Sequence, residues 1–324
     1  MPISSDWELP PSAQPKPEDY GYDLDHALSA VVGIRTIIPE DGFTAQTLGT
    51  ERAGHGVLIR SNGLVLTIGY LITEAEAVWL NFADGRTLPG HALAYDQQTG
   101  FGLVQVLDRG EHTALALGNS NKSRIGDRVV VAGAGGRSRC VAAHIVAKQE
   151  FAGYWEYLLE EAIFTAPSHP NWGGTAVIGS AGELIGIGSL QVQQASEGRP
   201  VYFNMVVPID LLKPILDDLL KHGRPNHPAR PWLGFYATEV QDKVVVAGLA
   251  AGAPARRAGL ATGDLVLAVA GDEITSLADM YRRIWSLGPA GVDVPLLVYR
   301  EGRTLQIKVP SSDRSRFLKT PHMH

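Results

Sequence analysis

The sequence predicts a mostly β protein made of a larger and a smaller domain. Its 36 glycines and 20 prolines are spread between short apolar runs, a distribution typical of strands joined by many tight turns. Apolar segments of strand length recur through the first part of the chain, and turn signals separate them. Of the 324 residues, 45% are hydrophobic, which is enough for one medium domain and one small domain. We expect a barrel or sandwich first and a smaller unit second.

Strands and turns alternate along the first domain. Residues 23–32 are expected to form a short helix or to lead into a strand. The strands expected after them are 56–60, 64–68, 77–82, 103–107 and 127–132. Tight turns are expected at Ser61-Asn62-Gly63, at Asp84-Gly85 and at Ser180-Ala181-Gly182.

The apolar pattern changes to that of a helix after Pro208. The apolar residues that recur at helical spacing are Ile209, Leu212, Ile215, Leu216, Leu219 and Leu220. Gly223 is the stop signal of this helix, and the prolines within residues 224–231 predict an extended linker. We therefore expect a flexible Pro-rich leader at 1–22, a first domain at 23–223, a second domain at 232–316 and a tail at 317–324.

The composition excludes several classes of function. A net charge of −6 without a run of Lys or Arg argues against nucleic acid and anionic membranes as partners. The leader lacks a signal-peptide pattern, and Cys140 is the only cysteine, so we expect a soluble cytoplasmic protein. Neither zinc spacing nor a phosphate or dinucleotide loop occurs, so no metal and no cofactor is expected. His322-Met323-His324 is interpreted as a mobile tail.

Several stretches of the first domain resemble the HtrA (DegP-type) protease family. Residues 54–72 resemble its Gly-Ser-Gly hairpin and the Leu-Thr-Asn-Asn-His-Val-Val segment that follows, and residues 94–104 resemble Asp-x-x-Thr-Asp-Leu-Ala-Val-Leu. Residues 170–174 stand where the family carries Gly-Asn-Ser-Gly-Gly. The further stretches that match are 83–86, 115–120, 125–127, 182–187 and 205–209. The resemblance covers residues 30–222 and implies a chymotrypsin-like double β-barrel.

The same resemblance implies that all three catalytic positions are altered. The histidine position is Tyr70, the aspartate position is Gly100 and the serine position is Trp172. A tryptophan has no nucleophilic atom, a tyrosine with a pKa of about 10 is a poor base near neutral pH, and glycine has no side chain. We therefore predict no catalytic residue and an inactive homologue of a serine endopeptidase.

Two alternatives concern this loop and its chemistry. The approach to Trp172, residues 165–170, holds two prolines that donate no N–H, so the oxyanion hole is expected to be misshapen. Trp172 either plugs a surface groove or contacts a peptide. The alternative function is an active endopeptidase with a non-standard catalytic set that uses His169 or Cys140.

The second domain resembles a PDZ domain of the kind that follows HtrA proteases. The matching stretches are Trp232-Leu233-Gly234-Phe235 and residues 253–260, 263–269 and 271–274. The first implies a loop whose backbone N–H groups bind a peptide carboxylate while the peptide adds a strand to the sheet edge. The residues expected to line its side-chain pocket, on one helix face, are Leu277, Tyr281 and Ile284.

These features predict a pseudoprotease that acts as a protein-interaction scaffold or adaptor. The expected partner is a protein or peptide, bound by its C-terminus or by an internal strand through the PDZ groove and by the barrel surface. The resemblance also implies a homotrimer, and a hetero-complex stays equally open.

Overall fold

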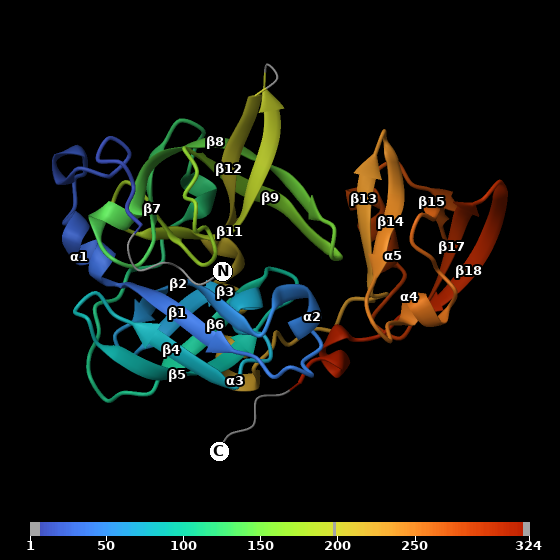
Figure 1. Cartoon of the computed structure of the whole chain (residues 1–324), viewed down its shortest axis with the longest axis horizontal. Helices are drawn as coiled ribbons and strands as arrows, with labels where there is room; N and C mark the ends of the chain where they lie inside the picture. Colours follow the sequence, from blue (N-terminus) through green and yellow to red (C-terminus); the bar gives the residue numbers. More distant parts are fainter. Residues whose placement is uncertain (1–6, 197–198, 320–324) are drawn as a thin grey trace. The chain divides into compact units, whose positions relative to one another are not determined.

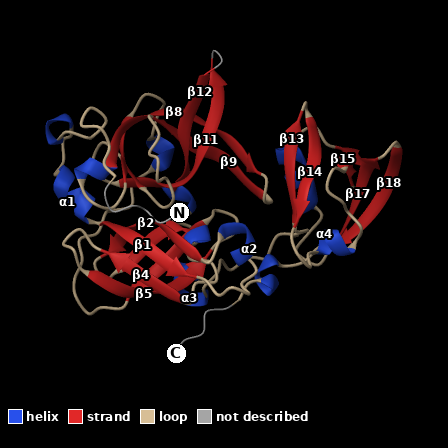
Figure 2. Cartoon of the chain, viewed as in Figure 1, coloured by secondary structure: helices blue, strands red, loops and turns tan. Residues whose placement is uncertain are grey.

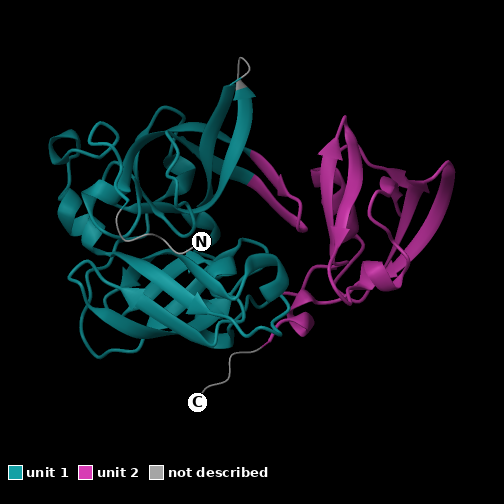
Figure 3. Cartoon of the chain, viewed as in Figure 1, with its two compact units in different colours: residues 1–149, 161–226, 320–324 teal, residues 150–160, 227–319 magenta. Residues whose placement is uncertain are grey.

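The chain folds into two compact units (Figure 3). The computed structural model describes residues 7–196 and 199–319. The first unit holds the described residues before 150 and those from 161 to 226, and the second holds residues 150–160 and 227–319. The tail His322-Met323-His324 lies outside the described residues.

The first unit contains two closed six-stranded antiparallel barrels (Figure 1). The strands of the first barrel are β1 (Val31–Ile37), β2 (Glu51–Arg60), β3 (Leu64–Ile68), β4 (Ala77–Asn81), β5 (Thr87–Tyr95) and β6 (Phe101–Val106). The strands of the second are β7 (Arg128–Ala132), β8 (Cys140–Gly153), β9 (Tyr157–Ala166), β10 (Ala176–Ile178), β11 (Leu184–Ser196) and β12 (Arg199–Pro208). The predicted mostly β double-barrel architecture is confirmed.

The expected strands of this unit overlap β2, β3, β4, β6 and β7, although β2 begins at Glu51 rather than at the expected residue 56. Strand β3 has the predicted bounds, and every one of its residues is buried. A two-sided apolar strand of this kind lies where both of its faces are covered, so it reads as a continuous apolar run. The three predicted turns join β2 to β3, β4 to β5 and β10 to β11.

The helices of the first unit are short (Figure 2). They are η1 (Pro17–Asp19), α1 (Leu24–Ser29), α2 (Ala45–Leu48), η2 (Gly69–Leu71), η3 (Ser120–Lys122), η4 (Arg137–Arg139), η5 (Ile209–Leu211) and α3 (Leu216–His222). Within the described ranges, no helix combines the length and the apolar character that crossing a membrane requires.

The helix expected after Pro208 is interrupted. It divides into η5 and α3, and Pro214 lies between the two. Proline removes a helical N–H and disfavours helical backbone in the residue before it, so the apolar period continues while the helix does not. The predicted stop is where it was expected: Gly223 has a φ of 69° and its N–H bonds to the carbonyl of Leu219.

The leader is tied to the second barrel from Trp7 onward, in contrast to the flexible segment expected. The N–H of Leu9 donates to the carbonyl of Ser138 over 2.9 Å, and the N–H of Ala142 donates to the carbonyl of Ala13 over 2.9 Å. A polar, Pro-rich composition predicts disorder only when the segment has no surface to pair with, and these contacts supply one.

The second unit is a small sheet with two short α-helices and one 3-10 helix among its described residues. Its strands are β13 (Phe235–Val240), β14 (Lys243–Leu249), β15 (Leu265–Val269), β16 (Asp272–Glu273), β17 (Asp293–Arg300) and β18 (Arg303–Pro310), in the order β13-β14-β15-β17-β18 with β16 beside β15. Its helices are α4 (Pro254–Arg257), α5 (Leu277–Ser286) and the 3-10 helix η6 (Arg314–Phe317). Ser276 caps α5 by accepting a hydrogen bond from the N–H of Asp279.

Candidate functional site

Tyr70 lies in η2, directly after β3. Its hydroxyl donates to the carbonyl oxygen of Ser189 over 2.9 Å. The indole N–H of Trp172, which can only donate, bonds to the same hydroxyl oxygen. Desolvation raises the pKa of Tyr70 above its ordinary value, and the bond from Trp172 opposes this in part. The hydroxyl of Tyr70 is therefore held neutral with both its donor and its acceptor capacity in use.

Gly100 occupies a tight turn beside Tyr70. Its φ is 82°, its N–H donates to the carbonyl of Asp96 over 2.8 Å, and its own carbonyl accepts the N–H of Gly69 over 2.7 Å. The carboxylate of Asp96 is buried and accepts both the N–H and the hydroxyl of Thr99. Asp96 is thus used to hold the turn, and Gly100 supplies backbone only.

The Trp172 loop is fastened to its neighbours through its backbone. The carbonyl of Gly173 accepts the N–H of His55 over 2.8 Å, and the N–H of Gly174 donates to the carbonyl of Gly188 over 2.9 Å. A Cβ atom added at Gly173 would lie 2.6 Å from the hydroxyl oxygen of Tyr70. The structure thus places Tyr70, Gly100 and Trp172 next to one another, as the resemblance implies.

The backbone donors of an oxyanion hole are incomplete at this loop. In trypsin-like sites the oxyanion is bound by the N–H of the nucleophile position and by the N–H two residues before it. Here those residues are Trp172 and Pro170, and proline has no N–H. The intervening N–H of Asn171 donates to Nδ1 of His169 over 3.1 Å.

His169 is a buried structural histidine. Its backbone N–H donates to Oδ1 of Asn204, and the Nδ2 amide of Asn204 donates back to its carbonyl. Nδ1 accepts the N–H of Asn171, so Nε2 carries the proton and donates to the carbonyl of Arg139 over 2.8 Å. Burial lowers the pKa of the His169 imidazole. Both ring nitrogens are therefore engaged.

Cys140 and His55 are buried as well. The thiol of Cys140 is 0% exposed and lies 3.6 Å from the carbonyl of Gly133 and 3.2 Å from that of Gly136, and burial raises its pKa to about 12. His55 accepts the N–H of Ala134 at Nδ1, and burial lowers its pKa to about 3. At neutral pH the thiol is protonated and the imidazole is uncharged.

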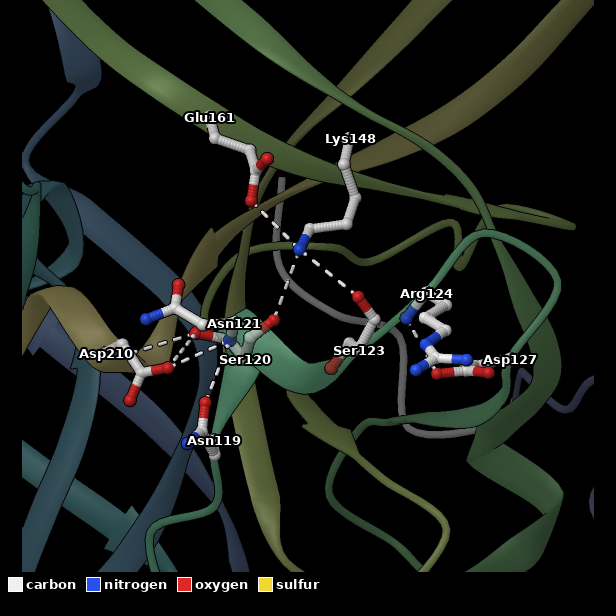
Figure 4. A network of polar contacts seen from close by, with 9 residues as sticks. All are labelled: Asn119, Ser120, Asn121, Ser123, Arg124, Asp127, Lys148, Glu161 and Asp210. Atoms are coloured by element: carbon white, nitrogen blue, oxygen red, sulfur yellow. Dashed lines mark hydrogen bonds and ion pairs between the residues drawn. The ribbon is translucent and has the colours of Figure 1, made fainter.

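A polar cluster at the base of the β8–β9 hairpin is used for structural bonds (Figure 4). The Nζ of Lys148 donates to the carbonyls of Ser120 and Ser123 and pairs with Glu161 over 2.9 Å. The carboxylate of Asp210 accepts the hydroxyl of Ser120 over 3.0 Å. The bonds of Lys148 join the segment between the barrels to the hairpin base, and the bond of Asp210 joins the same segment to η5.

The loop at residues 232–235 of the second unit binds a carboxylate, and that carboxylate belongs to Glu156. The N–H of Leu233 lies 3.0 Å from Oε2, while those of Gly234 and Phe235 lie 2.6 Å and 3.3 Å from Oε1. Glu156 is only 6% exposed. Burial raises the pKa of its carboxyl to about 7, and the three N–H groups oppose that rise.

Helix α5 presents one of its three predicted pocket residues to the same segment. The hydroxyl of Tyr281 donates to the carbonyl of Gly153 over 2.8 Å and accepts the N–H of Glu156 over 3.2 Å. Leu277 and Ile284 are buried in the core of this unit, as Tyr281 is. Because Tyr281 is 0% exposed, the helix face is covered by protein rather than open.

Trp232 contributes to the loop in a different way from its three neighbours. Its backbone pairs with Ser312 in an isolated bridge, and its ring packs against Phe317 with centroids 4.8 Å apart. Its side chain also lies against Gly234, whose φ is 76°. Trp232 therefore supports the turn, whereas the N–H groups that converge come from residues 233–235.

Comparisons with known proteins agree with this architecture. Residues 54–187 match the trypsin-like peptidase domain, and residues 231–310 match the PDZ domain. The chain is homologous to DegP, DegQ and the HtrA-type proteases. It is 29% identical to the periplasmic pH-dependent serine endoprotease DegQ of Escherichia coli over 318 residues, which cover 88% of this chain and 68% of DegQ. A probable periplasmic DegP-like endoprotease of Rhizobium meliloti is 27% identical over 78% of this chain and 51% of its own length.

Solved HtrA-type structures share the fold. The protease AlgW with a decapeptide has a TM-score of 0.52 at 20% identity, covering 93% of this chain and 100% of AlgW. The serine endoprotease of Yersinia pestis has a TM-score of 0.53 at 21% identity, covering 90% of this chain and 98% of its own.

The names of these HtrA relatives correct one prediction. DegQ and the DegP-like relatives are named periplasmic, which contradicts the cytoplasmic location expected from the sequence. That expectation depended on the lack of a signal-peptide pattern and on a single cysteine.

Sequence reasoning missed Glu156 entirely. The available signal was local: a single acidic residue stands among aromatic ones in Tyr154-Trp155-Glu156-Tyr157, directly after a long strand. The docking partner of that segment lies 77 to 79 residues away in the chain, so no local pattern indicates it.

Proposed function

We propose that this chain is a non-hydrolytic HtrA-type protein that acts as an interaction scaffold. The observation that carries the proposal is the state of Tyr70: its hydroxyl is bonded to both the carbonyl of Ser189 and the indole of Trp172. A general base must be able to take up a proton near neutral pH, whereas this hydroxyl is protonated, uses its proton in the bond to Ser189 and has a pKa raised by burial. Pro170 removes a backbone donor in addition.

The surrounding groups do not favour a displaced catalytic set. His169 has both ring nitrogens engaged, and the thiol of Cys140 is buried with a pKa of about 12. A nucleophile needs a neighbouring base or a lowered pKa, and the environment of Cys140 acts in the opposite direction. The binding function then belongs to the PDZ domain, whose loop offers three convergent N–H groups to a carboxylate.

The proposed setting and partners follow from the relatives and the PDZ domain. The names of the relatives support a periplasmic location. The partner class is a protein or peptide with a carboxylate and an extended segment that pairs with β13. The homotrimer and the hetero-complex implied by the sequence stay predictions.

The purified chain is expected to give no fluorophosphonate labelling and no turnover of unfolded casein. Loss of triad function lowers turnover by about 10⁴- to 10⁶-fold, so the rate should not exceed that of a blank measured beside DegQ. Casein cleavage followed by gel and by fluorescent release checks this. Metal-independent cleavage that disappears in His169→Ala or Cys140→Ala would refute the proposal and establish the displaced set.

A further inference from the structure

The peptide-binding groove of the PDZ domain already contains a segment of this chain. Residues 150–160, the tip of the β8–β9 hairpin, belong to the second unit (Figure 3). Glu156 places its carboxylate against the N–H groups of Leu233, Gly234 and Phe235. This is the position at which a PDZ loop receives the C-terminal carboxylate of a peptide.

The rest of the hairpin tip also reproduces the contacts of an extended ligand. The carbonyl of Tyr154 accepts the N–H of Ala237 in β13 over 2.9 Å, which is a bond of strand addition. Leu158 is 7% exposed and packs within the apolar core of the domain. Tyr281 of α5 bonds to the backbone at both Gly153 and Glu156. The hairpin tip thus supplies the three kinds of contact that a peptide ligand would make: a backbone hydrogen bond to β13, an apolar side chain and a carboxylate.

Arg282 bonds to both ends of the docked tip. This residue of α5 bonds to the carboxylates of Glu150 and Glu160, one at each end of the tip. Glu156 has a φ of 59°, the left-handed conformation that the last residue of a three-residue hairpin loop commonly adopts, so the turn itself sets the backbone from which its carboxylate reaches the loop.

We propose that the hairpin tip 150–160 is an intramolecular ligand of the PDZ groove, in which the side chain of Glu156 replaces a C-terminal carboxylate, so that an external peptide binds only where the tip has left. The inference rests on the proposed peptide-binding function of the PDZ domain. The groove then selects partners by competition with the hairpin tip. A peptide must offer a free carboxylate and an extended apolar end that together bind the groove more favourably than the tip does.

The docked tip should release more readily as the pH rises. The pKa of Glu156 is raised from 4.5 to about 7 in the docked state, so that state holds a proton more tightly than the free one. Docking is therefore strongest below pH 4.5, weakens as the pH rises to 7 and is constant above it. The charged and titratable groups that face Glu156 are Arg314 and Tyr281. Burial raises the pKa of the Tyr281 phenol, so it stays protonated over this range.

Peptide affinity of the full chain should accordingly increase by up to about a hundredfold between pH 5 and pH 8. A peptide's own C-terminal carboxylate, with a pKa of about 3.5, is ionised throughout. Fluorescence anisotropy with one peptide at a series of pH values measures the change. The same series on Glu156→Gln should be flat, and a wild-type series as flat as that of the variant would contradict the assignment.

Glu156→Gln in the full chain tests the proposal directly. The amides of residues 233–235 should exchange with deuterium about tenfold to a hundredfold faster than in wild type, because the glutamine amide places an NH₂ donor in one of the two positions from which the carboxylate oxygens accept these N–H groups. The affinity for a pool of fluorescein-labelled hexapeptides with an aliphatic end and a free C-terminal carboxylate should rise by a similar factor. The same peptides as C-terminal amides should not bind.

The matched control is Glu160→Gln, which removes the same charge from the same hairpin. The carboxylate of Glu160 is 73% exposed, and in this variant Arg282 keeps its bond to Glu150 at the other end of the tip. It should leave exchange at residues 233–235 and peptide affinity within about twofold of wild type, since exposed pairs contribute little. Glu156→Asp, whose carboxylate is one methylene shorter, should give intermediate values and guards against a folding defect in the glutamine variant.

The outcomes separate the two proposals. Unchanged amide exchange in Glu156→Gln, with native circular dichroism, would overturn the intramolecular ligand. Faster exchange without peptide binding in any variant would keep the docked tip and refute the proposed peptide-binding function. Faster exchange together with tighter, carboxylate-dependent binding is the result that both proposals predict.

Discussion

Gly174→Ala is expected to lower the free energy of unfolding of the barrel unit by at least about 4 kcal/mol, a loss at the upper end for single substitutions. A Cβ atom at this position would lie 1.8 Å from the carbonyl oxygen of His55, and its φ of 78° is unfavourable for alanine. The clash is with backbone in β2, which cannot rotate away as a side chain can. Urea unfolding followed by circular dichroism measures the loss.

Gly85→Ala is the matched control for that experiment. Gly85 has a φ of 85°, close to that of Gly174, but no atom lies within 4 Å of the added Cβ. The free energy of unfolding of Gly85→Ala should therefore fall only by the cost of placing alanine in a left-handed conformation, about 1–2 kcal/mol. An equal loss of stability in the two variants would show that the Trp172 loop can move away from β2. The hydrogen bonds of Gly173 to His55 and of Gly174 to Gly188 would then not hold the loop in place.

The expected contrast gives a reason for the two glycines that remain in the degenerate loop. A Cβ atom added at Gly173 would clash with the hydroxyl of Tyr70, and one added at Gly174 would clash with the backbone of His55. Both positions therefore need glycine, whatever residue stands at the nucleophile position. The loop thus keeps its shape for packing reasons, which is why the sequence motif is recognisable although Trp172 lacks the chemistry.

The fold of this chain could be predicted where local patterns decide it. Strand β3 and the turn after β2 were identified because an apolar run and a Ser-Asn-Gly turn act over a few residues. The break at Pro214 was missed because the apolar period continues across it. The contacts of Leu9 and Ala13 with the second barrel depend on residues far along the chain, and no local pattern carries them.

The candidate sites divide in the same way. Motif positions placed Tyr70, Gly100 and Trp172 together, and helical spacing placed Tyr281 on the groove side of α5. What occupies the groove could not be predicted, because Glu156 reaches the loop through tertiary structure. Pro170 was likewise visible in the sequence, but the structure of the loop was needed to show that it removes an N–H donor from the oxyanion hole.

Restoring the three catalytic side chains is expected to give only weak protease activity unless Pro170 is replaced as well. The triple variant Tyr70→His, Gly100→Asp, Trp172→Ser supplies base, orienting acid and nucleophile. The tetrahedral intermediate would still have one N–H donor, from residue 172, where two are needed. Adding Pro170→Gly supplies the second, and one such donor changes kcat by about 10²- to 10³-fold. The ratio of casein cleavage rates between quadruple and triple variants measures this effect.

The comparison isolates the donor because both variants carry the same three side chains. Pro170→Gly alone, without a nucleophile, should stay at the level of the blank, which controls for unspecific loosening of the loop. A ratio below about threefold would show that Trp172 and its neighbours bind the oxyanion without residue 170. A large ratio would mean that the chain differs from an active protease by a missing backbone donor as well as by three side chains, so that no single substitution returns it to proteolysis.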